Sequence, residues 1–211
     1  MTIELADIAA KADKKDERIN FDLLSGIYQG NGHSVLINPP KDEELLDFLL
    51  KVRPFYLSMR DSGDSRLPTA VMAQYVHDNV LYSNQKADRT HFEYRMKGEI
   101  PPLGKFIQGA ECREKSLITH LALAQLGYPS EVVGGWVRTP KASGAHKWVE
   151  SSITDEVVDP TLGVTMPKDV YYDKFHVDLC YLGNKPPKVY VRPPNNIWGW
   201  AISRSSFEFR R

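Results

Sequence analysis

Apolar residues recur every three or four positions in the first part of the chain, a spacing that predicts helices. One helix is expected over 41–52, KDEELLDFLLKV, with Pro54 ending it. Another is expected to begin at Pro68 and to continue through TAVMAQYVHDNVLYS. A polar helix is expected over 4–18, and VLINPP at 35–40 predicts a short strand that its prolines end.

The stretch over 84–109 is polar, rich in turn residues and longer than an ordinary connection between elements. We therefore expect a functional loop there that leads to Cys112. The next apolar pattern predicts a helix over 111–126, which Gly127 ends with Pro129 two positions later.

Three runs typical of strands follow this helix, at 131–137, 145–153 and 156–161. The short connections between them predict hairpins, and hairpins produce an antiparallel sheet. The tail over 166–211 is rich in aromatic residues and prolines. We expect further strands and cover for the core there, with a substrate-binding wall as the alternative. Helices followed by an antiparallel sheet indicate the α+β class.

Length and charge narrow the range of functions. The chain has 211 residues, which most simply form one domain over 1–211 with one core. Its 27 basic and 27 acidic residues balance, so no net charge favours a nucleic acid or an anionic membrane as partner. No apolar run has the length of a signal peptide near the start, or of a bilayer-spanning helix anywhere. We therefore expect a cytoplasmic protein.

The first candidate for chemistry is Cys112, which stands where the helix over 111–126 is expected to begin. Unpaired backbone N–H groups and the positive end of the helix dipole favour a thiolate at such a position. Cys180 has no helix start beside it, and we expect it in the core. Two cysteines cannot supply a disulfide framework or a four-sulfur zinc site, and no other metal-ligand spacing is present. Neither a metal nor a cofactor is therefore expected.

A catalytic thiol is commonly served by a histidine that a third polar group holds in place. His146 and Asp159 lie on two consecutive expected strands, and antiparallel neighbours hold facing side chains about 5 Å apart. The position that faces His146 falls a few residues past Asp159, so their contact requires a diagonal or a bulge. Trp148 and Glu150 share the face of His146, whereas Lys147 is expected to point away from it.

Three ordered blocks of the sequence resemble one family. GAECREKSLITHLALAQLGYPSEVVGGWV, GAHKWVES and VVDPTLG, together spanning 109–163, are similar to the core of the transglutaminase-like superfamily of papain-fold enzymes. YVHDNVLYS extends the similarity weakly, to about Ala70. The resemblance implies a papain-like α+β fold in which the nucleophile helix packs on an antiparallel sheet. The core would then cover 70–163, with an N-terminal helical extension over 1–65 and aromatic-rich strands or cover over 164–211.

The resemblance also implies a reaction. Cys112 would attack an amide carbonyl and form a thioester, His146 would move the proton, and Asp159 would orient the imidazole. Gln108 is the candidate for a second oxyanion donor beside the backbone N–H of the cysteine, and Trp148 is a candidate for substrate binding. Amidase or protease, protein deamidase and amine-accepting transferase all share this acyl-enzyme step, and the sequence leaves the choice open.

Two departures from the family pattern bear on this interpretation. Glu111 stands where the family has a small or apolar residue, and a carboxylate near the sulfur would oppose a thiolate unless it faces outward. Lys147 replaces the middle residue of a His-Ala-Trp motif, on the strand face assigned away from the chemistry. The expected partner is a peptide, protein or small-molecule amide substrate. The alternative is a catalytically inactive binding module that keeps the fold.

Overall fold

The computed structural model of the chain describes residues 25–30, 33–138, 143–177 and 190–191. The expected helix over 4–18 and Cys180 lie outside the described residues. The helices are η2 (Pro39–Lys41), α2 (Glu43–Asp61), α3 (Pro68–Asn79), α4 (Asn84–Met96), η3 (Leu103–Phe106), α5 (Cys112–Gln125) and α6 (Lys168–Lys174). The strands are β1 (Gly26–Gly30), β2 (His33–Ile37), β3 (Ser130–Arg138), β4 (Ser143–Ser151), β5 (Glu156–Asp159), β6 (Val164–Pro167) and β7 (Tyr190–Val191).

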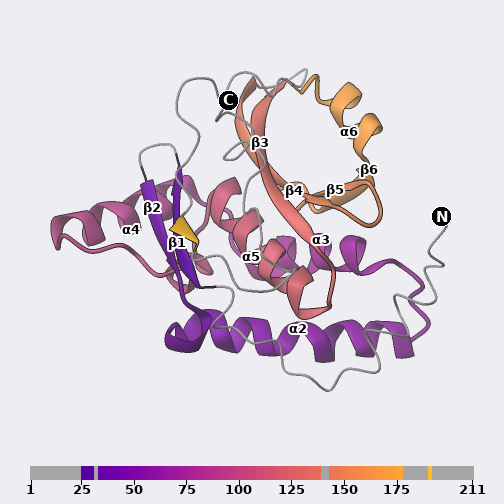
Figure 1. Cartoon of the computed structure of the whole chain (residues 1–211), viewed down its shortest axis with the longest axis horizontal. Helices are drawn as coiled ribbons and strands as arrows, with labels where there is room; N and C mark the ends of the chain where they lie inside the picture. Colours follow the sequence, from indigo (N-terminus) through magenta and orange to yellow (C-terminus); the bar gives the residue numbers. More distant parts are fainter. Residues whose placement is uncertain (1–24, 31–32, 139–142, 178–189, 192–211) are drawn as a thin grey trace.

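The strands form two antiparallel sheets, so the fold belongs to the α+β class (Figure 1). One sheet has the order β3–β4–β5–β6 and contains the three strands expected after the nucleophile helix. The other has the order β2–β1–β7. Its first two strands form a hairpin inside the segment expected to be a helical extension, so that expectation is wrong for the described part before α2.

Helix α5 occupies the centre of the core. It contacts strands β3 and β4 as well as helices α2 and α3 (Figure 1). Its residues from Arg113 to Ala124 are all buried, including several polar ones. The helix agrees with the one expected over 111–126, and it ends before Gly127, whose φ of +74° suits glycine at a helix C-terminus. The core therefore fixes the helix that begins at Cys112.

Two expectations about the preceding helices are wrong. Pro54 does not end α2, which continues to Asp61 with the proline inside it. Loss of one backbone hydrogen bond and the ring's steric clash cost about 3 kcal/mol in a helix interior. Phe55, Tyr56 and Met59 pack against the core beyond that point, and burial of their apolar surface offsets the cost.

The segment over 84–109 is not a long loop, because α4 and η3 occupy most of it. Ser83 caps α4, and its hydroxyl oxygen accepts the backbone N–H of Lys86 at 3.3 Å. Only two of the 13 residues of α4 are buried, so its sequence carries almost no apolar stripe. That polar composition is typical of a loop, which is why the pattern alone is misleading. In the described part of the chain, no helix has the length and apolar character needed to cross a membrane.

Candidate active site

Cys112 is the first residue of α5, and the chain before it is held on both sides. Glu111 is the N-cap residue, and its backbone N–H donates to Oε2 of Glu114 at 3.0 Å. The Glu111 side chain accepts the backbone N–H of Glu114 in return, which completes a capping box. One residue earlier, the N–H of Ala110 donates to the carbonyl oxygen of Leu81 at 2.8 Å. The position of the thiol is therefore fixed by backbone contacts.

His146, on strand β4, contacts one of the other two residues that the sequence indicates as catalytic, and the second influences its pKa. Its Nε2 atom is 2.7 Å from Oδ2 of Asp159, a carboxylate with no exposed surface. The Cys112 side chain also raises the pKa of this imidazole. Because the carboxylate engages Nε2, Nδ1 is the ring nitrogen left to face the sulfur. The structure thus brings Cys112, His146 and Asp159 together.

The strand register explains how His146 reaches Asp159. Strands β4 and β5 pair Val149 with Val158. Continuing that register places Thr161 opposite His146, two positions beyond Asp159. The contact therefore runs diagonally across the two strands, as expected from the sequence.

Asp159 accepts hydrogen bonds at both carboxylate oxygens. Oδ1 accepts the backbone N–H groups of Thr161 at 2.9 Å and of Leu162 at 3.2 Å. Oδ2 accepts the hydroxyl of Tyr171, from α6, at 2.8 Å and also faces His146. Burial alone would raise the pKa of Asp159, but the hydrogen bond and charge of His146 and the Tyr171 hydroxyl hold it below its usual value. The carboxylate is consequently charged in the folded protein.

The charged carboxylate determines the protonation of the imidazole. Burial lowers the pKa of His146, but hydrogen bonds to Asp159 and Cys112 outweigh this effect, and the pKa rises to about 10. His146 is therefore an imidazolium near neutral pH, and the Cys112 side chain contributes to this charge. This is the charge arrangement that stabilises a cysteine thiolate.

Trp148 does not line a substrate site, and that expectation is corrected here. Its side chain has no exposed surface, and its indole N–H donates to Oε1 of Glu150 at 3.1 Å. Its ring centroid lies 6.1 Å from that of His146 and 5.5 Å from that of Tyr171. The tryptophan therefore supports the imidazole from inside the protein.

Lys147 lies on the opposite face of the strand, as expected. It is buried, with its ammonium 5.6 Å from the centroid of the Tyr28 ring. Gln108 is exposed, and its carbonyl oxygen accepts the ammonium of Lys86 at 3.2 Å. A role for the Gln108 side chain as oxyanion donor remains a prediction.

Two tyrosines in the region of the catalytic candidates were not singled out from the sequence. Tyr171 is one of many aromatic residues in the tail, and no local pattern marks it. Tyr82 forms a parallel bridge with Ala110, two residues before the cysteine. Burial raises the pKa of Tyr82, and the charges of Cys112 and Glu111 raise it further. The sequence signal that could have identified Tyr82 is the aromatic position near the end of YVHDNVLYS.

A buried ion cluster follows Cys112 at the start of α5. Oε1 of Glu114 is 2.6 Å from Nη2 of Arg113 and 3.2 Å from Nε2 of His91. Burial alone would raise the pKa of Glu114, but hydrogen bonding to His91 and the charge of Arg113 lower it to about 2. Arg113 also lies 3.9 Å from Oε2 of Glu111, so a cation offsets part of the charge next to Cys112.

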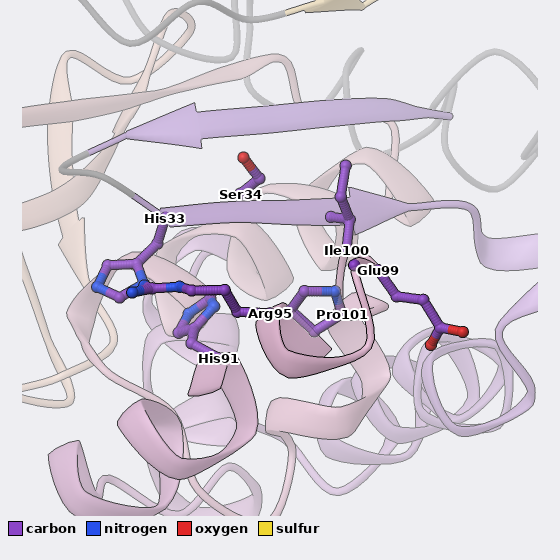
Figure 2. Close-up of a pocket in the computed structure, with 8 residues that line it drawn as sticks. His33, Ser34, His91, Arg95, Glu99, Ile100 and Pro101 are labelled. Carbon is purple, nitrogen blue, oxygen red and sulfur yellow. The ribbon is translucent and has the colours of Figure 1, made fainter. Parts of the chain in front are cut away.

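A hollow of about 200 Å³ lies on the far side of His91, between strand β2 and helix α4 (Figure 2). The Arg95 side chain extends toward the His33 ring, while the Glu99 side chain points away from both (Figure 2). It contains none of the three catalytic candidates. Within the described ranges, no group of three or more His, Cys, Asp or Glu side chains is arranged to hold a metal ion.

Comparison of the chain with protein-family models, with curated proteins and with solved structures gives no match. The function must therefore be inferred from the arrangement of Cys112, His146 and Asp159.

Proposed function

We propose that this chain is a cysteine-nucleophile enzyme of transglutaminase-like, papain-like fold that acts on an amide through a thioester acyl-enzyme. One observation carries the proposal. Nε2 of His146 lies 2.7 Å from the buried carboxylate of Asp159, and the Cys112 side chain, at the start of α5, raises the pKa of the same imidazole. A buried carboxylate, an imidazole and a thiol in that order are the components of a nucleophilic triad.

The first half of the reaction forms the acyl-enzyme. His146 takes the proton of the Cys112 thiol, and the sulfur attacks the carbonyl carbon of the amide. The resulting oxyanion accepts hydrogen bonds from the unpaired backbone N–H at the start of α5; one such donor is worth about 3 kcal/mol to the transition state. His146 then gives its proton to the leaving amine, the C–N bond breaks, and a thioester remains on the sulfur.

The second half releases the acyl group. Water or a second amine attacks the thioester, His146 takes its proton, and the C–S bond breaks. Asp159 stays charged through both halves, since its four hydrogen-bond contacts, from two backbone N–H groups, Tyr171 and His146, stabilise the anion. Its function is to keep the imidazole in one tautomer and to stabilise the protonated ring.

The arrangement of elements supports the transglutaminase-like assignment. The nucleophile begins a buried helix, α5, that packs against β3 and β4. The histidine lies on β4 and the aspartate ends β5, the next strand in the sheet. This is the order of elements that the resemblance of residues 109–163 implies.

The surroundings of the sulfur favour a substrate with an apolar group near the scissile amide. Leu81 and Tyr82 run beside the segment that precedes Cys112, and they are 51% and 47% exposed. Large apolar side chains that remain exposed together provide a surface for an apolar partner.

Alkylation with iodoacetamide, mapped by mass spectrometry, tests the proposal without a known substrate. At about pH 6, we expect Cys112 to react at least about tenfold faster in the folded protein than in the urea-unfolded chain. Cys180 in the unfolded chain provides an internal reference for an ordinary thiol. His146→Ala should remove the enhancement, because it removes the proton acceptor. Equal rates for folded and unfolded Cys112 would instead support the inactive binding module.

A second assay separates the possible reactions. A glutamine-containing peptide is incubated with the protein, with and without a primary amine, and the products are identified by mass spectrometry. Ammonia release with peptide deamidation indicates hydrolysis, and addition of the amine indicates transfer. Cys112→Ala is the control for both products. An adduct trapped on the wild type and detected by its intact mass reveals the acyl-enzyme.

A further inference from the structure

Helix α6 presents two adjacent tyrosines to two different carboxylates. The Tyr171 hydroxyl donates to Oδ2 of Asp159 at 2.8 Å, and the Tyr172 hydroxyl donates to Oε1 of Glu150. The helix follows strand β6 and packs against β5 and β6 at the edge of the sheet (Figure 1). Helix α6 therefore contacts the back of the site, although it contains none of the three catalytic candidates.

The two contacts differ in what they reach. Glu150 accepts the indole N–H of Trp148 and the ammonium of Lys168, so Tyr172 belongs to the support around the tryptophan. Tyr171 reaches the oxygen of Asp159 that faces His146.

Tyr171 is well placed to control that oxygen. Its side chain has no exposed surface, and its ring lies against Trp148 and Phe175, with centroids at 5.5 Å and 4.6 Å. The hydroxyl therefore has little freedom to turn away from Asp159. The two backbone N–H groups that hold Asp159 reach only Oδ1, so Tyr171 and His146 are the hydrogen-bond partners that the described residues give to Oδ2.

We propose that Tyr171 is a positioning residue of the active site, which holds the buried carboxylate of Asp159 charged and directed at Nε2 of His146. The inference rests on the proposed function, and it assigns to α6 the role of supporting the triad. A hydrogen bond to a charged group is stronger than one between neutral groups, so loss of this hydroxyl affects the site more than its small volume suggests.

The charged groups around Asp159 define the direction in which loss of the Tyr171 hydroxyl changes the site. His146 faces it from β4, Tyr171 from α6, and the charge of Lys115 reaches it from α5. The ammonium of Lys115 itself donates to the carbonyl oxygen of His77, at 3.3 Å. With the Tyr171 hydroxyl removed, the buried carboxylate takes up a proton more readily. The imidazolium then loses its counter-charge, so a higher pH is needed before Asp159 is ionised and its ion pair with His146 forms.

The experiment compares Tyr171→Phe with Tyr172→Phe, which removes the neighbouring hydroxyl from the same helix without touching Asp159. The rate of Cys112 alkylation is measured from about pH 4 to pH 9, and the ring of His146 is followed by NMR. For Tyr171→Phe we expect the midpoint of the acid side of the rate profile to rise by about 1 pH unit. Tyr172→Phe should keep the wild-type midpoint. An unchanged midpoint in Tyr171→Phe, or an equal rise in both variants, would overturn the inference.

Two additions keep the test decisive. If Tyr171→Phe does not fold, 3-fluorotyrosine placed at position 171 keeps the ring and makes the hydroxyl a stronger donor. The midpoint of the acid side of the rate profile should then fall. An unchanged or higher midpoint overturns the inference. If the wild-type Cys112 reacts like an unfolded thiol, the proposed function fails. The NMR titration of His146 still reports whether Tyr171 acts on the Asp159–His146 pair.

Discussion

Nδ1 of His120 lies 3.0 Å from the hydroxyl oxygen of Ser130, a contact that joins α5 to strand β3 inside the core. The side chains are almost fully buried, with 2% and 3% of each residue exposed. Burial lowers the pKa of His120 to about 4, and a hydrogen bond with the Ser130 backbone only partly opposes this effect. The ring is therefore neutral in the folded protein near neutral pH, within the helix that presents Cys112.

Stability should consequently fall in mild acid. An unfolded histidine has a pKa of about 6.5, so between pH 6.5 and about 4 the unfolded chain binds a proton at His120 that the folded protein excludes. The stabilisation is complete above pH 6.5 and is lost as the pH falls, by about 1.4 kcal/mol per pH unit and about 3 kcal/mol in all. Urea unfolding at successive pH values should show this slope in the wild type and a shallower slope in His120→Gln. Parallel curves would contradict the prediction.

The buried carboxylate of Glu114 should be important for stability. Glu114→Gln removes the charge that pairs with Arg113 at 2.6 Å, and a buried ion left without its partner costs about 3–5 kcal/mol. Glu93→Gln is the matched control, because Glu93 forms an exposed pair with Arg89 at 2.7 Å. Such a pair contributes under about 1 kcal/mol. Chemical unfolding of the two variants measures the difference, and similar losses would contradict it.

Glu114 should also make the free energy of unfolding fall as the pH becomes acidic. The pKa of Glu114 is about 2 in the folded protein, against 4.5 for an ordinary glutamate. Its contribution is therefore complete above pH 4.5 and is lost as the pH falls toward 2. The difference in unfolding free energy between the wild type and Glu114→Gln should shrink over that interval.

Short-range rules account for the parts of the site that can be predicted from the sequence. Gly127, with its φ of +74°, ends the nucleophile helix where a Gly-x-Pro pattern indicates it. His146 and Asp159 lie on either side of one hairpin turn. Their positions predict a diagonal contact, and the observed register produces it. Each of these signals acts within one element or between two adjacent strands.

Long-range packing determines the rest. The polar sequence of α4 has no apolar stripe to reveal a helix, and its capping residue Ser83 is a weak signal by itself. Strand alternation puts Trp148 on the face of His146, but it does not reveal that residues of α6 cover that face. Nothing local distinguishes Tyr171 from the other aromatic residues nearby. Only the packing of α6 on the sheet selects it.

The alkaline limit of the site should depend on Asp159. The pKa of His146 is about 10, raised against the effect of burial by hydrogen bonds to Asp159 and Cys112. The stabilisation from the protonated ring is complete below pH 6.5 and is lost as the pH rises toward 10. In Asp159→Asn the carboxylate charge is gone, and NMR of ¹³C-labelled histidine should show His146 titrating at least about 2 pH units lower. A wild-type ring that titrates near 6.5 would contradict this.

Tyr82 should select reagents that carry an apolar group, because its ring lies beside the segment before Cys112 and is 47% exposed. The test uses the ratio of Cys112 alkylation rates for N-benzyl iodoacetamide and for iodoacetamide. Tyr82→Ala should lower that ratio about tenfold, since roughly 1.4 kcal/mol of apolar contact in the transition state is lost. Tyr82→Phe keeps the ring and should keep the ratio. Leu50→Ala removes a similarly exposed apolar side chain on α2 and should leave the ratio unchanged. A ratio that falls equally in Tyr82→Ala and Leu50→Ala would mean that Tyr82 makes no specific contact with the reagent, because loss of any exposed apolar group would then have the same effect.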